Sequence, residues 1–251
     1  MPSPRSDLLL GAAALLLACS PVMTRPSTTS SASSSSAASS ASAASASASA
    51  SAASSSEAPA IVQVGLPVLR ARAAEVPAER IGTPEFQALV DRMIDVMRKA
   101  PGVGLAAPQI GEGLRVLVLE DRGELLQKLN PDELRERERV AVPVHVVINP
   151  VLRHVGAERR TFFEGCLSLR GYSALVERSA EVEVTGLDRR GQPQTLRWRG
   201  WPARILQHEV DHLDGTLYID RMLPRSFSTN EQARALYGGL PIAEVRRRLG
   251  L

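Results

Sequence analysis

The chain contains few of the residues that characterise several common classes of protein. Its 251 residues include two cysteines, too few for a disulfide framework. Aromatic residues make up 4% of the sequence, which argues against a base-stacking surface, and we predict no DNA partner. The formal net charge of +3 is too mild to indicate a strongly charged partner. Function must therefore be sought in local motifs.

Histidine is also scarce, and its distribution is uneven. Two of the four histidines lie in the run His208-Glu209-Val210-Asp211-His212, an H-E-x-x-H pattern. On a helix, positions i and i+4 share a face, so both imidazoles can reach one metal ion. Glu209 then lies beside the ion, where its carboxylate can act as a general base towards water. An isolated run of this kind is equally typical of an ordinary amphipathic helix, so it needs support from elsewhere.

The residues around the histidines predict a partly buried helix. Pro202 suits an early helical position, and Gly215 lies where a helix would end. Ile205, Leu206 and Leu213 supply an apolar face. The two histidines are therefore expected on a rigid element.

A third metal ligand must come from outside the histidine run, because a catalytic zinc-type site uses three protein ligands. A metzincin would have histidine at position 218, where this chain has Tyr218, and a thermolysin-like enzyme would use a downstream glutamate, for which Glu231 and Glu244 are the candidates. Cys166, in Glu164-Gly165-Cys166-Leu167-Ser168, is favoured because Cys-His-His is a known catalytic ligand set. Alone, Cys166 would be read as a buried free cysteine.

The segment Gly102-Val103-Gly104-Leu105-Ala106-Ala107-Pro108-Gln109 supplies a further chemical group. Its two glycines allow the backbone to approach a ligand closely. The side-chain amide of Gln109 can donate to an oxygen on which negative charge develops. The segment can also be a simple glycine-rich turn between a helix and a strand, and the two interpretations are compatible.

In this order, the three blocks resemble the three motifs of the peptide deformylases, with every position of the motif cores present. The similarity extends over roughly residues 60 to 230. Pro67–Arg70 resembles the opening segment of the family. The segments that resemble the organelle-type branch are Val176–Arg178, Gly186–Asp188, Gly200–Trp201 and Leu217–Asp220. The resemblance implies an α+β fold in which small antiparallel sheets pack around a central helix carrying the H-E-x-x-H run.

The resemblance also implies a reaction and a metal site. Cys166, His208 and His212 would bind one divalent ion, and Glu209 would be the general base and later the proton donor to the leaving amine. The enzyme would hydrolyse the N-formyl group from the terminal methionine of new polypeptides and release formate. Fe(II) is expected from the family, while the donor set also suits Zn(II), Ni(II) or Co(II).

Substrate contacts are implied in the same way. Gln109 and the backbone N–H of Leu167 would hold the oxyanion, and backbone at Gly104 would contact the peptide. Val103 and Ile205 are expected in the pocket for the methionine side chain.

One segment departs from the common family pattern. After the second motif, many members continue with Val or Ile and then Pro, whereas this chain reads Leu169-Arg170-Gly171-Tyr172-Ser173. In relatives these positions border the peptide-binding strand. The difference leaves the chemistry intact and the substrate preference open.

Two other functions remain as alternatives. A metallopeptidase of the H-E-x-x-H type would need a third ligand other than Cys166 and would cut unformylated peptides. A non-catalytic metal-binding or peptide-binding module would be expected to lack Glu209 or Gln109, and both are present.

Periodicity predicts the main elements of the folded region. A helix should begin after Thr83, with a buried stripe, and end at Pro101-Gly102. Strands are expected at 115–120, 144–148, 180–186 and 194–198, with a turn at 188–191. The charged run 132–139 is expected to be a solvated helix or insertion. The stripe comprises Phe86, Leu89, Val90, Met93, Ile94 and Met97.

The first 57 residues differ from the remainder. Residues 1–19 resemble a signal peptide that ends in a lipobox-like Leu16-Leu17-Ala18-Cys19, and residues 20–57 form a Ser/Ala-rich linker expected to be disordered. Residues 58–251 are expected to be the catalytic domain with a short C-terminal extension.

The N-terminal segment leaves the compartment open. The protein would be cytoplasmic if the start is mis-assigned or the signal is uncleaved, and otherwise a bacterial lipoprotein anchored in the membrane through Cys19. At the other end, Arg246-Arg247-Arg248 could contact ribosomal RNA, although a solvated helix end is favoured.

Overall fold

The computed structural model describes residues 61–100, 102–127 and 129–251. The expectations for residues 1–19 and 20–57, including the lipid anchor at Cys19, lie outside this part of the chain. Among the described helices, none combines the length and the apolar character needed to cross a membrane.

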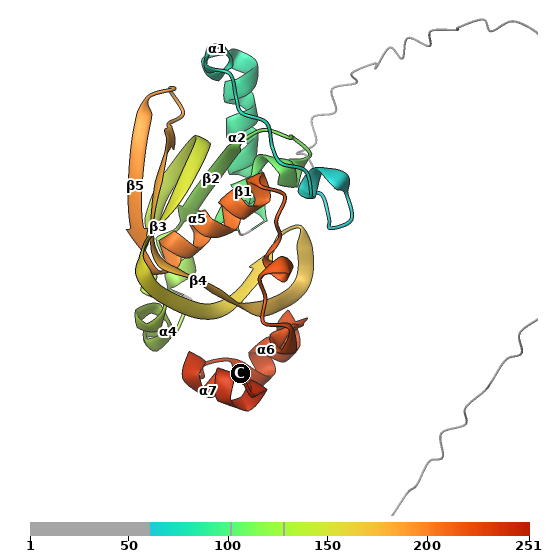
Figure 1. The fold of residues 1–251 in the computed structure, drawn as a ribbon, viewed down its shortest axis with the longest axis vertical. Coiled ribbons are helices and arrows are strands. Elements are labelled where there is room, and N and C mark those ends of the chain that lie inside the picture. The colour runs from blue at the N-terminus through green and yellow to red at the C-terminus, as the bar shows by residue number, and fades with distance from the viewer. Residues whose placement is uncertain (1–60, 101, 128) are drawn as a thin grey trace, which may run out of the picture. The chain divides into compact units, whose positions relative to one another are not determined.

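An antiparallel sheet of six strands dominates the fold (Figure 1). The first five strands are hydrogen-bonded in sequence order, and the short β6 pairs with β4. The small antiparallel sheets expected from the sequence are thus joined into one continuous sheet. Their bounds are β1 Gly104–Ala106, β2 Val116–Asp121, β3 Val142–Cys166, β4 Leu169–Leu187, β5 Pro193–Arg199 and β6 Ser228–Thr229.

Strands β3 and β4 form a long curved hairpin that extends well beyond the other strands. The predicted segments 144–148 and 180–186 correspond only to the most apolar part of each strand. Register shifts at Val155/Arg159 and at Gly165/Cys166 bend the hairpin. The sequence pattern does not mark the outer part of the hairpin as strand, because one face of that part is solvated. Charged pairs such as Arg153 opposite Glu183 interrupt the apolar alternation there.

Helix α2, Pro84–Lys99, packs on one face of the sheet. The Thr83 hydroxyl caps it by accepting a hydrogen bond from the Phe86 N–H at 3.3 Å, as the sequence predicts. All six residues of the predicted apolar stripe are buried. They form a core with Val116 and Val118 of β2.

Helix α5, Gly200–Leu213, packs on the opposite face and carries the H-E-x-x-H run. Leu117 and Leu119 of β2 contact this helix layer, whereas their neighbours in the strand face α2. Gly215, with φ of +72°, follows the last turn of the helix, as expected. The central helix is therefore held within the core on a rigid support (Figure 1).

The remaining elements are short. Helix α4 confirms that the charged run 132–139 begins as a helix, and none of the helix's own residues is buried. In the turn at 188–191, the Gly191 N–H donates to the Asp188 carbonyl at 3.0 Å. The other elements are η1 Pro67–Leu69, α1 Ala78–Ile81, η2 Ala107–Ile110, α3 Gly123–Leu126, α4 Pro131–Glu136, η3 Tyr218–Asp220, η4 Pro224–Ser226, α6 Asn230–Tyr237 and α7 Ile242–Leu249.

Candidate active site

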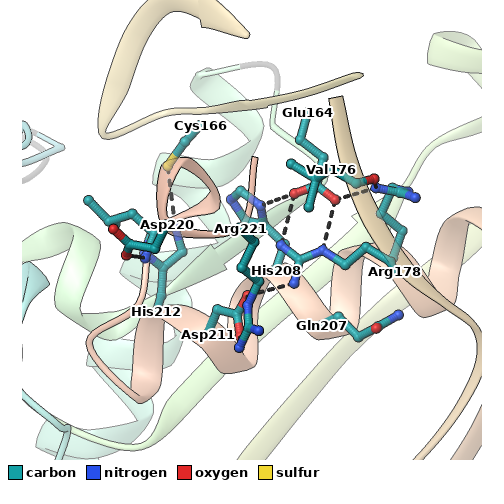
Figure 2. Close-up of polar contacts among 12 residues, drawn as sticks. Glu164, Cys166, Val176, Arg178, Gln207, His208, Asp211, His212, Asp220 and Arg221 are labelled. Carbon is teal, nitrogen blue, oxygen red and sulfur yellow. Dashed lines mark hydrogen bonds and ion pairs between the residues drawn. The ribbon is translucent and has the colours of Figure 1, made fainter. Parts of the chain in front are cut away.

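Three residues with metal-binding side chains meet where the end of β3 approaches α5. The ligand atoms of Cys166, His208 and His212 all lie within 4.8 Å of one another. The Cys166 Sγ is 3.2 Å from the His212 Nε2 (Figure 2). The other two histidines, His145 and His154, do not belong to this group, which is the only one of its kind in the described part of the chain.

The donor set fits a divalent transition metal. In a tetrahedral site, Zn–N bonds near 2.0 Å and Zn–S bonds near 2.3 Å place the ligand atoms about 3.3 to 3.5 Å apart. The Cys166 Sγ and the His212 Nε2, at 3.2 Å, are close to this spacing, and all three ligand atoms lie within 4.8 Å of one another. Burial lowers the pKa of His212 well below its usual value, so this imidazole is neutral at pH 7, as a ligand must be. Three donors leave a fourth position for water.

Glu164, two residues before Cys166, lies at the centre of a buried polar network (Figure 2). It accepts a hydrogen bond from His208 Nδ1 at 3.0 Å, which orients the Nε2 of that ring towards the other ligands. It also accepts two hydrogen bonds from Arg178, both at 2.9 Å, and one from Arg204. Burial alone would raise the pKa of the Glu164 carboxyl, but the arginines hold it well below its usual value.

The network continues along α5 on the side away from Cys166. Asp211 accepts hydrogen bonds from Arg178 and, at 2.8 Å through both its oxygens, from Arg221. The Gln207 side chain accepts a hydrogen bond from the N–H of Ser179 in β4 at 3.0 Å and donates one to the Ser179 carbonyl at 2.9 Å. These contacts fix α5 against β4, and they fix the two histidines with it.

Glu209 is buried beside the ligands and has an unusual environment. Its Oε2 is buried and makes no hydrogen bond within the described residues. Burial raises the pKa of the Glu209 carboxyl to about 7. A Cβ at Gly104 would lie 2.2 Å from the Glu209 Oε1, so only glycine at position 104 leaves room for this carboxylate.

Gln109 is held with its amide nitrogen pointing towards the metal ligands. Its Oε1 accepts a hydrogen bond from the Ala106 N–H at 2.8 Å, which leaves Nε2 to contact the Cys166 Sγ at 3.6 Å. Nε2 is also 3.4 Å from the Ser168 hydroxyl. The orientation of the amide is therefore set by the backbone of the first motif.

Residues 62–64 connect the first and second motifs. The Val62 N–H donates to the Gln109 carbonyl at 2.9 Å, and the Val64 N–H donates to the Ser168 carbonyl at 2.8 Å. The Gln63 amide nitrogen donates to the Leu167 carbonyl at 3.0 Å. The segment therefore holds the loops of both motifs at a constant separation.

A cavity of about 730 Å³ opens onto the ligands. Cys166, His208, Glu209 and Gln109 line it. The three residues expected to contact the peptide, Val103, Gly104 and Ile205, also line it, as does Leu167, the second expected oxyanion donor. A separate polar hollow of about 490 Å³ contains none of the three metal-binding residues, so the chemistry belongs to the first cavity.

The structure brings together every residue that the sequence analysis assigns to the site. It also adds Glu164, Arg178 and Arg204, whose roles were not anticipated. Glu164 lies inside the second motif, and the sequence signal for its role is a carboxylate two residues before the candidate ligand Cys166. The alternative ligand Glu244 is instead paired with Arg247 and Arg248.

Comparisons with known proteins agree with this geometry. Residues 58–227 match the model of the family described as polypeptide deformylase. The chain is 49% identical to peptide deformylase 1A, chloroplastic, of Solanum lycopersicum, over 77% of this chain and 68% of that protein. It is 48% identical to peptide deformylase 1 of Streptomyces coelicolor, over 70% of this chain and 79% of that protein.

A solved structure is also similar in fold and in sequence. The class I type b peptide deformylase from Acinetobacter baumannii with Met-Ala-Ser bound matches with a TM-score of 0.57 and 32% identity. The match covers 64% of this chain and 96% of that one. Motifs, fold, site geometry and relatives therefore agree, and the chain belongs to the polypeptide deformylase family.

Proposed function

We propose that Cys166, His208 and His212 hold one divalent metal ion at which the protein carries out its reaction. As a member of its family, the protein is a metal-dependent hydrolase that removes the N-formyl group from nascent polypeptides. The observation that carries the residue assignment is the meeting of one thiol and two imidazoles beside a buried carboxylate, at the inner end of a cavity.

Glu209 has the position required for proton transfer. When bound, the ion supplies a Lewis acid that polarises the formyl carbonyl and makes water a stronger acid. Glu209 takes one proton from the attacking water while the water oxygen bonds to the formyl carbon. Glu209 then gives that proton to the peptide nitrogen as the C–N bond breaks. The products are formate and a peptide with a free amino terminus.

Gln109 and Leu167 are proposed as the donors to the developing oxyanion. The Gln109 amide needs no reorientation, because its oxygen is already held by the Ala106 N–H. Fixed donors of this kind stabilise the transition state without the cost of reorganising solvent. The Leu167 N–H belongs to the loop that Gln63 and Val64 hold in place.

The cavity walls suggest how a peptide is held. Strand β1 is hydrogen-bonded to β2 along one of its edges, and the Phe163–Gly165 part of β3 is hydrogen-bonded to β4 along one of its edges. Both strands also line the cavity. An extended peptide can therefore form backbone hydrogen bonds with a strand edge, including that at Gly104. Val103 and Ile205 provide apolar surface for the methionine side chain.

Fe(II) is the proposed native metal, on the strength of the family resemblance. The thiolate and two imidazoles also suit Zn(II), Ni(II) and Co(II). An exposed iron–thiolate pair is prone to oxidation, so preparation without oxygen is part of the test.

The test is formate release from formyl-Met-Ala-Ser by the anaerobically purified protein, loaded in turn with each of the four metals. Wild type is expected to release formate, and Cys166→Ala is expected to lose both bound metal and release. Cys19→Ala is the matched control, since it removes the other cysteine of the chain. Metal-loaded wild type without formate release would contradict the proposal, and cleavage of unformylated peptides would favour the peptidase alternative.

We also propose the domain division expected from the sequence, with residues 58–251 as the catalytic unit and Cys19 as a possible lipid attachment site. Cell fractionation of wild type and Cys19→Ser tests the anchor. An unchanged soluble location in the variant and in wild type would rule it out.

The arginine cluster at the C-terminus is proposed as a solvated helix end, not a ribosome contact. Arg247 and Arg248 both pair with Glu244 within α7. Arg246 donates to the Thr161 hydroxyl at 3.1 Å. Co-sedimentation with ribosomes that disappears in a variant with all three arginines replaced would contradict this assignment.

A further inference from the structure

The arginine and lysine residues that line the substrate cavity form two groups, and those of the inner group are already paired. Arg139 makes two hydrogen bonds to the buried carboxylate of Asp121, at 2.7 and 2.9 Å. Arg204 is bound to Glu164 and to two backbone carbonyls. These arginines are therefore neutralised, and they have little residual attraction for a substrate charge.

The outer group consists of Lys99 and Arg170, and it differs from the inner group in exposure and in ion pairing. Both side chains line the cavity and both are exposed. Lys99 is the last residue of α2, and Arg170 is the second residue of β4, just after the turn at 167–168. Neither forms an ion pair with an acidic residue in the part of the chain that the structure describes. The exposed lining of the cavity therefore carries two cations, whereas its two carboxylates, Glu164 and Glu209, are buried.

The C-terminal segment holds Arg170 and its turn in position. Strand β6 pairs with β4 at Tyr172 and Ser173, two and three residues after Arg170. The rings of Tyr172 and Phe227 are stacked, with centroids 5.2 Å apart and planes inclined by 8°. Asn230, the first residue of α6, also lines the cavity, and it lies beyond residue 227, where the match to the family ends. The outer wall is thus partly built from residues outside the family's common region.

The direction of the peptide follows from the proposed function, on which this inference rests. The formyl group must lie near Cys166 and Glu209, so the residues after methionine run outwards through the cavity. They pass between surfaces that carry Lys99, Arg170 and Asn230. Each step of an extended chain adds about 3.3 Å, so successive side chains reach the outer wall within a few residues.

We infer that Lys99 and Arg170 select formylated polypeptides with acidic residues shortly after the initiating methionine. Unpaired cations at an open rim attract an acidic side chain of the substrate and repel a basic one, which changes both the rate of association and the affinity. The amide of Asn230 provides a neutral hydrogen-bonding group at the same wall. The segment 169–173, at which the chain departs from the common family pattern, thereby becomes a determinant of substrate choice.

The test compares three amidated peptides, formyl-Met-Ala-X-X, in which X is Glu, Gln or Lys. Amidation removes the terminal carboxylate, which would otherwise bind the same cations. For the metal-loaded wild type, kcat/KM is expected to be about 10-fold higher for the Glu peptide than for the Lys peptide, since each exposed pair contributes modestly. The ratio should fall towards one in about 0.5 M salt, because exposed charges are screened.

The double variant Lys99→Glu/Arg170→Glu should invert this ratio. Arg190→Glu is the matched control, because Arg190 is an exposed arginine that does not line the cavity, and its ratio should equal that of wild type. Equal kcat/KM for the Glu and Lys peptides in wild type, or a ratio unchanged in the double variant, would overturn the inference.

A binding measurement separates this inference from the proposed function. The unformylated peptides Met-Ala-Glu-Glu and Met-Ala-Lys-Lys, both amidated, are titrated against the metal-loaded protein by calorimetry. Tighter binding of the Glu peptide in wild type, reversed in the double variant, supports the selectivity without any turnover. Failure to hydrolyse the Gln peptide would count against the proposed function alone, whereas equal affinities would count against the selectivity alone.

Discussion

A carboxylate oxygen of Glu209 occupies the space that a side chain at Gly104 would fill. A Cβ on Gly104 would lie 2.2 Å from the Glu209 Oε1 and 2.7 Å from its Cδ, far inside van der Waals contact. The first and third sequence motifs are therefore sterically dependent on each other. This contact gives Gly104 a role beyond the backbone contact expected from its motif.

Gly104→Ala should displace the Glu209 carboxylate and reduce kcat by about 100-fold, because misplacement of a catalytic group by about 1 Å has effects of this size. Metal content should stay close to that of wild type, since Cys166 and the histidines are not displaced directly. Gly113→Ala is the control, because a Cβ there meets no atom within 4 Å. Formate release at the wild-type rate by Gly104→Ala would show that Glu209 can relocate without cost.

Glu164→Gln tests the buried network behind the metal ligands. The substitution leaves the buried Arg204 without an acidic partner, leaves Arg178 with Asp211 alone, and weakens the orientation of His208. We expect a loss of about 3 kcal/mol in the free energy of unfolding and about 10- to 100-fold weaker metal binding. Thermal unfolding and chelator competition for bound Ni(II) measure the two effects.

The control for this substitution is Glu183→Gln. Glu183 pairs with Arg153 at 2.8 Å on the exposed face of the β3–β4 hairpin, where the Arg153 side chain is 66% exposed. Such a pair contributes about 1 kcal/mol or less. Equal losses of stability in the two variants would contradict the central position of Glu164.

Tyr237→Ala tests whether α6 supports the substrate cavity. The Tyr237 ring stacks on Phe163, which lines the cavity, with centroids 5.8 Å apart. Loss of the stacking partner should let Phe163 move and raise KM about threefold while kcat is unchanged, since aromatic pairs are worth about 0.5–1.5 kcal/mol. Steady-state kinetics on formyl-Met-Ala-Ser measure this. Leu236→Ala, at an exposed neighbouring position, should leave KM at the wild-type value.

The ion pair between Glu120 and Arg98 should make stability depend on pH. The hydrogen bond from Arg98 lowers the pKa of the Glu120 carboxyl below its usual value, and the pair joins β2 to α2. Because the folded state lowers this pKa, the stabilisation is fully present above the unfolded pKa, about 4.3. It is lost as the pH falls through the lower, folded-state pKa.

Glu120→Gln should therefore lower the free energy of unfolding by about 0.5 to 1 kcal/mol at pH 7. The difference from wild type should shrink towards zero as the pH falls below 4, as measured by urea unfolding at a series of pH values. Glu75→Gln replaces an exposed glutamate that forms no ion pair among the described residues, and it should show no such trend. A constant difference across pH would exclude the ionic origin of the effect.

The elements that could be predicted from the sequence are those whose signals are local. The cap at Thr83 and the apolar stripe that follows it describe α2 without reference to the rest of the chain. The H-E-x-x-H spacing likewise predicts from the local sequence that the two histidines share a face of α5. The length of β3 and β4 could not be predicted, because a hairpin with one solvated face has charged residues where an apolar alternation would mark a strand.

The buried network around Glu164 depends on distant residues. Arg178 is 14 positions away from Glu164 in sequence, and Arg204 is 40 positions away. Nothing in the local pattern of either arginine indicates that it is buried or which carboxylate it meets. The contact between Gly104 and Glu209 could not be predicted either. The spacing of two glycines predicts that some group lies close to the backbone, but it does not identify that group as Glu209.

The loops of the site come together only through long-range pairing. Gln109 and Cys166 are 57 positions apart, and Cys166 and His212 are 46 positions apart. Contacts of such separation form late in folding, because chain entropy must be lost before they are made. A fragment that ends before α5 therefore lacks both histidines and has no metal centre. With the proposed ligands, acquisition of the metal during biosynthesis must wait until the chain has been made through His212, so a shorter nascent chain cannot carry the activity.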